Sequence, residues 1–304
     1  MARPHEARTV GGELTAVAPT QTDSGAVEVH LSGVVHIYPS PDGDVVALRG
    51  VDLDIRAGES VALLGPSGAG KSTVLGLLAA EFQPSAGSIR IGDLDVDRAR
   101  SDVLATLRAR DVSLVVQGGR TNLLPYATAA QNVWFAQHGA RSRGHTLDRT
   151  PGELLDLFGL ASIADVPAAQ MSAGEQQRLA LVAGVATLPR LLLLDEPTSQ
   201  LSESERNEVI DAVVDIHRAL GMTVVVVTHD SDVASRLERT VTIRDGRVGA
   251  EGRQGREYAI VGRDGSMHLP PDVLDHLPPD SLVRVTVLED RVELRRVDSE
   301  ENSP

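Results

Sequence analysis

The stretch SVALLGPSGAGKST, residues 60–73, decides the fold class of this chain. It begins with a short, continuously apolar run, 60–65, of the kind expected for a parallel strand buried on both faces. A glycine-rich segment then fits the spacing G-x-x-x-x-G-K-[ST] at every fixed position, from Gly65 to Ser72. A helix is expected to begin near Gly70. Because this motif cradles phosphates when it joins a strand to a helix, the sequence predicts an α/β domain that binds a nucleotide.

The residues of this loop indicate how a nucleotide would be held. Glycines let backbone N–H groups turn toward phosphate oxygens, and the following helix adds the positive end of its dipole. Lys71, the single lysine among 29 basic residues, is expected to reach the β- and γ-phosphates, and Ser72 is expected to bind Mg²⁺. An arginine-rich chain that keeps lysine here indicates a need for a compact ammonium group. The predicted nucleotide-binding residues are Gly65, Pro66, Ser67, Gly68, Ala69, Gly70, Lys71, Ser72 and Thr73.

Two further apolar strands end in residues of the kind found at catalytic sites. The run LLLLD, 191–195, ends in Asp195 and is followed by Glu196. Such a strand would deliver one carboxylate to Mg²⁺ (Asp195) and the other to an attacking water (Glu196). The run MTVVVVTH, 222–229, ends in His229 at the strand end, where α/β proteins bind ligands. We therefore predict a metal-binding role for the first of these residues and catalytic roles for the other two.

Other segments complete the predicted α/β domain, 25–252. The stretches 27–38 and 45–55 alternate in polarity and are predicted to be antiparallel strands, with a Pro-Asp-Gly turn at 41–43 between them. Strands that alternate with helices favour a parallel sheet. Helices are expected over 98–110, over 152–166, from about Ala173, and from about Glu203 to Gly221 after a Ser202-x-x-Glu205 capping box.

The two ends of the chain have different patterns. Residues 1–24 are polar, with scattered Gly, Pro and Thr, and are predicted to form a disordered arm. After about Gly255 the pattern becomes strand, turn, strand, short helix and hairpin, which predicts a β-rich module over 256–298 before an acidic tail, 299–304. A module this small buries too little surface to be stable alone. We therefore expect it to dimerise or to pack on the main domain.

The composition excludes several classes of function. The net charge of −14 argues against a protein that coats nucleic acid, and the absence of cysteine excludes disulfides and thiolate metal sites. No apolar stretch reaches the roughly 18 residues of a membrane span, and the N-terminus lacks the apolar region of a signal peptide. We therefore expect a cytoplasmic protein whose membrane role comes through a partner.

The order and spacing of these motifs resemble the ABC ATPases over about residues 27–250. The specific part is MSAGEQQR, 171–178, because other proteins with a P-loop lack this signature. The resemblance implies a P-loop NTPase fold with a parallel core sheet, an antiparallel β subdomain and an α-helical subdomain. It also implies a homodimer in which two ATP molecules lie between the P-loop of one subunit and the signature of the other.

The same resemblance assigns roles to further residues. Tyr38 should stack on adenine, although an ordinary strand aromatic is the alternative reading. Gln117, which ends the apolar run VSLVVQ, should sense both Mg²⁺ and the attacking water, and His229 should hold the γ-phosphate. The signature residues expected at the nucleotide are Ser172, Gly174 and Glu175, the first two at the γ-phosphate bound to the opposite subunit.

Two positions depart from the family pattern. Ala173 stands where the family usually has glycine, and its methyl group could strain a close backbone approach to phosphate. The segment after Glu196 ends in Ser202, where the family usually has aspartate; serine can still cap a helix, but the charge is gone. Because that aspartate normally links the two nucleotide sites, their coupling is open, whereas hydrolysis is still expected.

Within the family, Gln117 with Asn122-Leu-Leu-Pro125 and a Glu-Gln-Gln signature is similar to the LolD/MacB-like group for lipoprotein release and macrolide export. This similarity implies an integral-membrane permease of the FtsX/MacB-like type as partner, and a place on the inner face of the membrane. Two alternatives remain. A soluble ABC ATPase acting on DNA or ribosomes would usually carry long insertions or a second cassette, and a DNA-binding regulator with an ATP sensor is suggested by the C-terminal module.

That module, around RDGSMHLPPDVLDHL and the following hairpin, is similar to AbrB-like swapped-hairpin domains, many of which bind DNA as dimers. Its charge opposes DNA binding. The segment 257–304 contains 11 acidic residues and 5 arginines, whereas phosphate contact requires positive charge. We therefore expect dimerisation or regulation, and binding to nucleic acid is disfavoured.

Overall fold

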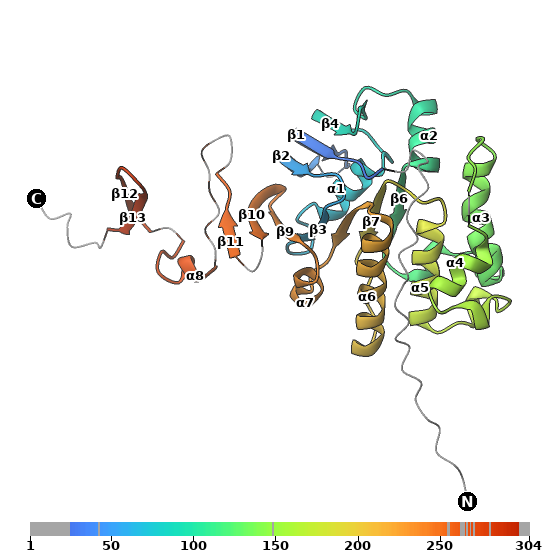
Figure 1. Cartoon of the computed structure of the whole chain (residues 1–304). Coiled ribbons are helices and arrows are strands. Elements are labelled where there is room, and N and C mark those ends of the chain that lie inside the picture. Colours follow the sequence, from blue (N-terminus) through green and yellow to red (C-terminus); the bar gives the residue numbers. More distant parts are fainter. Residues whose placement is uncertain are drawn as a thin grey trace, which may run out of the picture.

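The computed structural model places a two-sheet domain in the middle of the chain and a small hairpin near its C-terminal end (Figure 1). The predicted arm, 1–24, and the acidic tail, 299–304, lie outside the described residues, as does Asp42 of the predicted turn. The described residues are 25–41, 43–147, 149–253, 256–261, 265, 267, 269, 271–279 and 281–297.

A seven-stranded sheet forms the centre of the domain, in the order β11-β10-β9-β3-β8-β7-β6. The five strands from β9 to β6 are parallel, and β10 and β11 extend the sheet antiparallel beyond β9. The strands are β3 (Ser60–Leu64), β6 (Val112–Val115), β7 (Leu191–Asp195), β8 (Thr223–Val227), β9 (Arg239–Arg244), β10 (Arg247–Arg253) and β11 (Arg256–Ala259).

The apolar runs of β7 and β8 are continuous because both faces of the central sheet are covered. Leu191 and Leu193 belong to one hydrophobic core, and the intervening Leu192 and Leu194 belong to the other. All four leucines are fully buried. Successive side chains of a strand point to opposite faces, so a strand between two cores needs an apolar residue at every position. The predicted α/β class with a parallel core sheet is confirmed.

A second, antiparallel sheet covers one of these cores. It consists of β1 (Val29–Tyr38), β2 (Val45–Ile55), β4 (Ala86–Ile91) and β5 (Leu94–Asp95), in the order β2-β1-β4-β5. Helix α1 (Lys71–Leu78) is buried along most of its length, and its leucines share a core with β1, β2 and β4. The first two strands agree with those predicted at 27–38 and 45–55.

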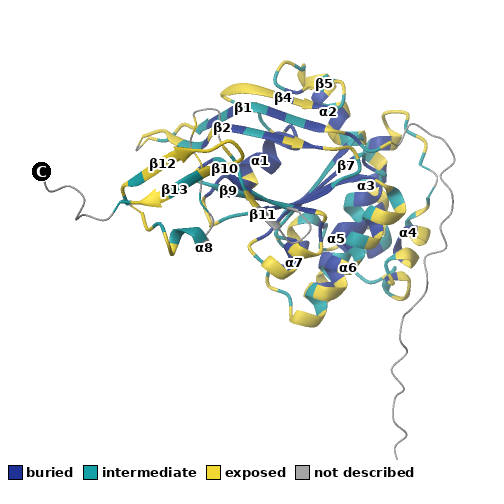
Figure 2. Cartoon of the chain, turned by 60° about the vertical axis from the view of Figure 1, so that its left-hand side comes forward, coloured by how far each residue is buried: buried dark blue, intermediate teal, exposed yellow. Residues whose placement is uncertain are grey.

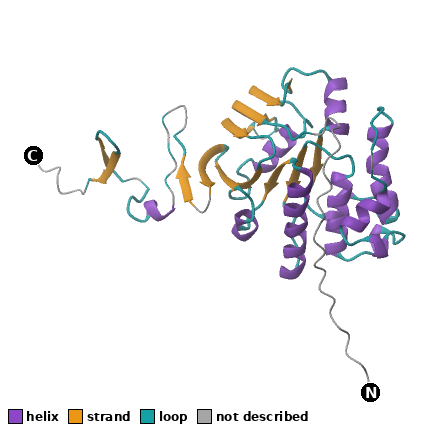
Figure 3. Ribbon diagram, viewed as in Figure 1, coloured by secondary structure: helices purple, strands orange, loops and turns teal. Residues whose placement is uncertain are grey.

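Helices cover the other core, and three of them, α3, α4 and α5, lie together in Figure 3. Four of the described helices begin with a capping box, at Thr128, Thr150, Ser172 and Ser202. In each, the N-cap hydroxyl accepts a hydrogen bond from the backbone N–H three residues later, and the side chain of that residue accepts one from the N-cap N–H. The helical segments are α2 (Ser101–Arg110), η1 (Gly119–Asn122), α3 (Ala129–Arg141), α4 (Pro151–Leu157), η2 (Ala161–Ile163), η3 (Ala168–Gln170), α5 (Ala173–Val185), α6 (Glu203–Leu220) and α7 (Ser231–Ser235).

One predicted helix is shorter than expected. The segment 152–166 was expected to be helical throughout, but α4 ends at Leu157 and only the single turn η2 follows. Gly159 has a φ of 66°, a left-handed conformation that a continuing α-helix cannot contain. Gly221 ends α6 in the same way, with a φ of 64°, and there the stop agrees with the prediction.

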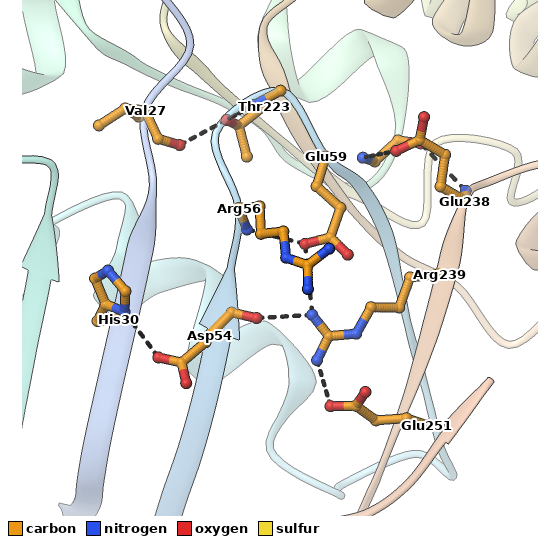
Figure 4. Close-up of polar contacts among 11 residues, drawn as sticks. Val27, His30, Asp54, Arg56, Glu59, Thr223, Glu238, Arg239 and Glu251 are labelled. Carbon is orange, nitrogen blue, oxygen red and sulfur yellow. Dashed lines mark hydrogen bonds and ion pairs between the residues drawn. The ribbon is translucent and has the colours of Figure 1, made fainter. Parts of the chain in front are cut away.

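A buried arginine joins the two sheets (Figure 4). The Arg239 side chain, at the start of β9, is 5% exposed. Its guanidinium donates to the backbone oxygen of Asp54 on β2 at 2.7 Å, lies 3.5 Å from a carboxylate oxygen of Glu59, and forms an ion pair with Glu251 on β10. One side chain therefore contacts the antiparallel sheet, the turn before β3 and the strand next to β9 in the central sheet.

The C-terminal part continues from the central sheet into a small β-rich module. An isolated bridge pairs Val261 with Met267, and a single turn of helix, α8 (Pro271–Leu274), follows. Strands β12 (Val283–Val287) and β13 (Val292–Arg296) form a separate two-stranded sheet, which agrees with the predicted hairpin. Across the described ranges, no helix combines the length and apolarity that crossing a membrane requires.

Candidate functional site

The glycine-rich loop follows β3 and closes tightly on neighbouring backbone. Gly65 and Gly70 have φ values of 143° and 99°, and a Cβ atom on Gly65 would lie 2.0 Å from the backbone oxygen of Ile243. At Gly70 it would lie 2.7 Å from the backbone oxygen of Ala47. The two glycines are therefore required by close approach as well as by backbone conformation. Pro66, Ser67 and Gly68 are exposed at the loop tip, whereas Ala69 and Thr73 are buried.

Lys71 lies at the first position of α1 and is folded over the loop. Its ammonium group donates to the backbone oxygens of Gly65 and Pro66 at 2.7 and 2.8 Å, and the residue is 8% exposed. A buried cation needs paired acceptors, and the loop carbonyls supply them. The loop itself therefore holds the ammonium group in place without a nucleotide.

The two predicted acids follow one another at the end of β7. Asp195 is half-buried, and the Ser72 hydroxyl on α1 is one of the groups that act on its pKa. Burial raises the pKa of Asp195, while the Ser72 hydrogen bond and the Lys71 charge act to lower it. A hydroxyl at the start of α1 and a carboxylate at the end of β7 are oxygen donors of the kind that Mg²⁺ takes together with substrate phosphates.

Glu196 and His229 meet across the ends of β7 and β8. His229 Nδ1 lies 2.9 Å from Glu196 Oε2, and the Glu196 backbone N–H donates to the Val227 oxygen at 2.9 Å. The Glu196 side chain is 13% exposed, whereas that of His229 is 73% exposed. The carboxylate is therefore sheltered and fixed from two sides, and the imidazole faces solvent.

Gln117 extends from the end of β6 toward the segment after Glu196. Its side-chain amide donates to the Ser199 hydroxyl at 3.3 Å. The turn beyond it is held by Asn122, whose side chain bonds both the N–H and the carbonyl of Val116. Residues from the ends of β3, β6, β7 and β8 are thus brought to the same edge of the sheet, where open α/β proteins bind ligands.

Tyr38 ends β1, and its side chain reaches Thr73 on helix α1. Its hydroxyl donates to the Thr73 hydroxyl at 3.3 Å, and the residue is 39% exposed. The ring stands edge-on to His36, with centroids 4.6 Å apart, and His36 lies 4.7 Å from Phe82. Two aromatic neighbours and one hydrogen bond therefore orient this ring, and neither neighbour was singled out by sequence reasoning.

The signature residues occupy the N-terminus of α5. Ser172 is the N-cap and exchanges hydrogen bonds with Glu175 in a capping box. The Gly174 backbone N–H donates to Glu205 Oε1 at 3.2 Å, while the other oxygen of Glu205 bonds Ser202 at the start of α6. Hydrogen bonds from Ser202 and from Gly174 hold the pKa of Glu205 below its ordinary value.

Glu205 is a residue of this site whose full role the sequence did not indicate. The spacing Ser202-x-x-Glu205 predicted a capping box, which is present. The same carboxylate also contacts α5, a helix about thirty residues earlier in the chain, and no local pattern encodes that contact. It joins the helical subdomain to the segment that follows Glu196.

Comparison with known proteins identifies the family. Residues 48–199 match a family model described as ABC transporter. The chain is 39% identical over 232 residues to the "Lipoprotein-releasing system ATP-binding protein LolD" of Anaeromyxobacter dehalogenans, covering 76% of this chain and 96% of the relative. It is 35% identical over 243 residues to the "Macrolide export ATP-binding/permease protein MacB" of Rhodopseudomonas palustris, covering 80% of this chain and 37% of the relative.

Solved structures of ATP-binding cassettes support the same family. The structure titled "Dimeric structure of a post-hydrolysis state of the ATP-binding cassette MJ0796 bound to ADP and Pi" is 31% identical, with a TM-score of 0.65 over 75% of this chain and 99% of that chain. A second dimeric structure of the same cassette gives a TM-score of 0.66. The matches give no support to the AbrB-like resemblance of the C-terminal module. The chain therefore belongs to the ABC transporter family, as an ATP-binding and ATP-hydrolysing domain of that family.

Proposed function

We propose that this chain is the motor subunit of an ABC transporter whose membrane-spanning permease is a separate protein of the FtsX type. The observation that carries the proposal is the convergence of Lys71, Ser72, Asp195, Glu196 and His229 at one edge of the central sheet. That arrangement supplies the parts that ATP hydrolysis needs.

The chain covers its relatives to different extents. The chain covers 96% and 98% of two proteins named as ATP-binding proteins of a lipoprotein-releasing system. It covers only 37% and 33% of two relatives named as combined ATP-binding and permease proteins. The similarity thus extends along the ATP-binding part alone, and lipoprotein handling or a related export process is the corresponding task for the complex.

The site residues divide the reaction among themselves. In this proposal the loop from Gly65 to Ser72 cradles the phosphates, and Lys71 exchanges its loop carbonyls for phosphate oxygens. Glu196 orients the water and accepts its proton, His229 contacts the γ-phosphate, and Gln117 reaches the same water from β6. The hydroxyl of Ser72 and the carboxylate of Asp195 fit a Mg²⁺ ion, which would neutralise phosphate charge.

The signature helix would complete the site of a second subunit. The N-terminus of α5 offers backbone N–H groups and a positive dipole end, which favour an anion. In the chain alone the Gly174 N–H is bonded to Glu205, so a γ-phosphate from a partner would have to replace that carboxylate. ATP bound between two copies would then hold a closed homodimer, and hydrolysis would release it.

A pull-down from the native cells tests the proposal. Tagged Glu196→Gln would be purified in mild detergent with ATP and Mg²⁺, and the proteins that co-purify identified by mass spectrometry. We expect a membrane protein with a few spanning helices and a large external domain. Tagged Lys71→Ala, which should lose about 10- to 100-fold in nucleotide affinity because a charge-assisted contact is removed, serves as the control.

Two outcomes contradict the proposal in different ways. Recovery of only soluble proteins, DNA or ribosomes would contradict the proposed permease partner, although the assignment of ATP hydrolysis to this chain would stand. Equal ATP affinity in Lys71→Ala and in the wild type would contradict the assignment of the phosphate loop itself.

A further inference from the structure

Helices α6 and α7 lie side by side, and each has exposed as well as buried residues (Figure 2). An ion pair joins them. Arg206 Nη1, on the first turn of α6, lies 2.8 Å from a carboxylate oxygen of Asp230, the N-cap of α7. The two side chains are 36% and 20% exposed. An ion pair so accessible to water contributes little to stability, so the effect of this one lies in what it holds in place.

Asp230, which follows His229 directly, is held at each of its polar side-chain atoms and at its backbone N–H. Its Oδ1 accepts hydrogen bonds from the backbone N–H groups of Asp232 and Val233, at 2.9 and 3.4 Å. Its own N–H donates to the hydroxyl of the fully buried Thr228 at 3.1 Å, and its Oδ2 contacts Arg206. The first three contacts are local, whereas Arg206 lies 24 positions earlier in the chain. Arg206 therefore ties this turn to a different part of the fold.

The pair of Arg206 with Asp230 and the contact of Glu196 with His229 join the same two stretches of chain. One stretch runs from Glu196 into the first turn of α6, and the other is the turn that contains His229 and Asp230. His229 Nδ1 meets Glu196 Oε2 at 2.9 Å, and Asp230 meets Arg206. Two stretches joined at one point can pivot about it, whereas a second point fixes their relative direction.

The His229 side chain is 73% exposed, so packing does little to hold it. We propose that Arg206 is a positioning residue for His229: it holds Asp230 against α6 and so sets the direction in which the imidazole meets the γ-phosphate. This inference rests on the role proposed above for His229. A misplacement of about 1 Å can cost roughly 10²-fold in rate. Arg206 should therefore act on the hydrolysis of bound ATP, while the phosphate loop, to which it makes no contact, keeps its affinity for the nucleotide.

A second ion pair between the same two helices supplies a matched control. Arg236, the C-cap of α7, pairs with Asp211 on α6. This pair also joins an arginine to an aspartate across α6 and α7, but it lies at the end of α7 away from His229. Removing it should loosen the packing of the two helices without freeing the turn that contains His229.

The test compares ATP hydrolysis by the full-length wild type, Arg206→Gln, Arg206→Lys and Arg236→Gln. We expect kcat to fall about tenfold in Arg206→Gln, less than the effect of a full 1 Å misplacement because the local contacts of Asp230 remain. The KM for ATP should stay within about twofold, and Arg206→Lys should recover most of kcat because an ammonium group can supply the single contact with Asp230. Arg236→Gln should match the wild type. Equal kcat values for Arg206→Gln and Arg236→Gln would overturn the proposal.

A double-mutant cycle with His229→Ala shows whether Arg206 acts through the imidazole. Single-turnover hydrolysis with protein in excess keeps low rates measurable, and equilibrium ATP binding shows that each variant is folded. In the His229→Ala background, Arg206→Gln should change the rate by less than about twofold, because the side chain that it positions is gone. The same tenfold loss in both backgrounds would overturn the proposal. Hydrolysis by His229→Ala alone at the wild-type rate would instead contradict the role proposed for His229, and with it a positioning role for Arg206.

Discussion

Glu196 has a backbone conformation that residues other than glycine seldom adopt. Its φ is 47°, in the left-handed region, which costs of the order of 1–3 kcal/mol. The strain is held by the hydrogen bond from its N–H to Val227 and by the side-chain contact with His229. Such strain is concentrated where position matters, so the carboxylate direction at the end of β7 is fixed before any substrate arrives.

The first prediction concerns this carboxylate. Glu196→Gln should lower steady-state ATP hydrolysis by at least about 100-fold, because general bases contribute roughly 10²- to 10⁴-fold. ATP affinity should stay within about twofold, since the amide keeps the shape and the phosphate loop is untouched. A steady-state ATPase assay and equilibrium nucleotide binding measure the two quantities separately. Hydrolysis near the wild-type rate would exclude Glu196 as the base.

His30 leads to a prediction about pH. It lies between Asp54, 2.8 Å from Nδ1, and Glu28, 3.1 Å from Nε2. The hydrogen bond with Asp54 raises the pKa of His30 above its ordinary value of about 6.5, and Glu28 adds to this against the opposing effect of burial. A histidine with a raised folded-state pKa stabilises the fold below its unfolded pKa, and this stabilisation is lost as the pH rises through the folded pKa.

We therefore expect His30→Gln to weaken the pH dependence of stability above about pH 6.5. The wild type should lose more free energy of unfolding than the variant as the pH rises from there, by a small amount because the pair is partly solvent-exposed. Urea unfolding across this range measures the difference, and added salt should reduce it. Parallel profiles for the two proteins would show that His30 titrates without coupling to folding.

At the scale of elements, Gly119 joins η1 to α5 by close backbone contact. It is buried, and a Cβ atom there would lie 2.6 Å from the backbone nitrogen of Gln177 on α5. A neighbouring backbone cannot move aside as a flexible side chain can. The glycine thus lets the segment after Gln117 rest directly against the signature helix.

A matched pair of glycine substitutions tests that contact. Gly119→Ala should lower the free energy of unfolding by about 1–3 kcal/mol, as overpacking does. Gly139→Ala is the control, because Gly139 lies within α3 with nothing near its missing Cβ; there alanine should stabilise by about 0.5–1 kcal/mol. Denaturant unfolding compares the two. A Gly119→Ala protein as stable as the wild type would mean that the two segments separate at little cost.

The elements differ in how far the sequence predicts them. Strands β3, β7 and β8 were predictable because burial on both faces imposes an uninterrupted apolar run, and α6 was predictable because Ser202, Glu205 and Gly221 mark its two ends. The length of α4 was not, because Gly159 interrupts a pattern that is otherwise compatible with a helix. Contacts such as Gln117 with Ser199 and Gly174 with Glu205 depend on packing, which local patterns do not encode.

At the scale of the whole molecule, the sequence predicted two kinds of sheet but not how they are joined. Alternating apolar runs indicate strands, yet strand order depends on pairings between distant segments, such as β3 between β8 and β9. Arg239 is an example of a residue whose role depends on such distant pairings. In the sequence it is one of 28 arginines, and only the structure shows that it is buried between two sheets with Glu59 and Glu251.

This arginine gives the last prediction. Arg239→Ala removes the cation that pairs with Glu251 and with Glu59, whose side chain is 13% exposed, and it removes the bond to the Asp54 backbone oxygen. Breaking a buried ion pair from one side is strongly destabilising, so the free energy of unfolding should fall by about 3 kcal/mol.

Arg239→Lys should lose less, because it keeps the charge but cannot reach three acceptors with one planar group. Adding Glu59→Gln to Arg239→Ala should recover part of the loss, because it removes one of the two carboxylates that lose this cation. Urea unfolding of the four proteins tests this order, and equal stability of the wild type and Arg239→Ala would show that core packing alone holds the two sheets together.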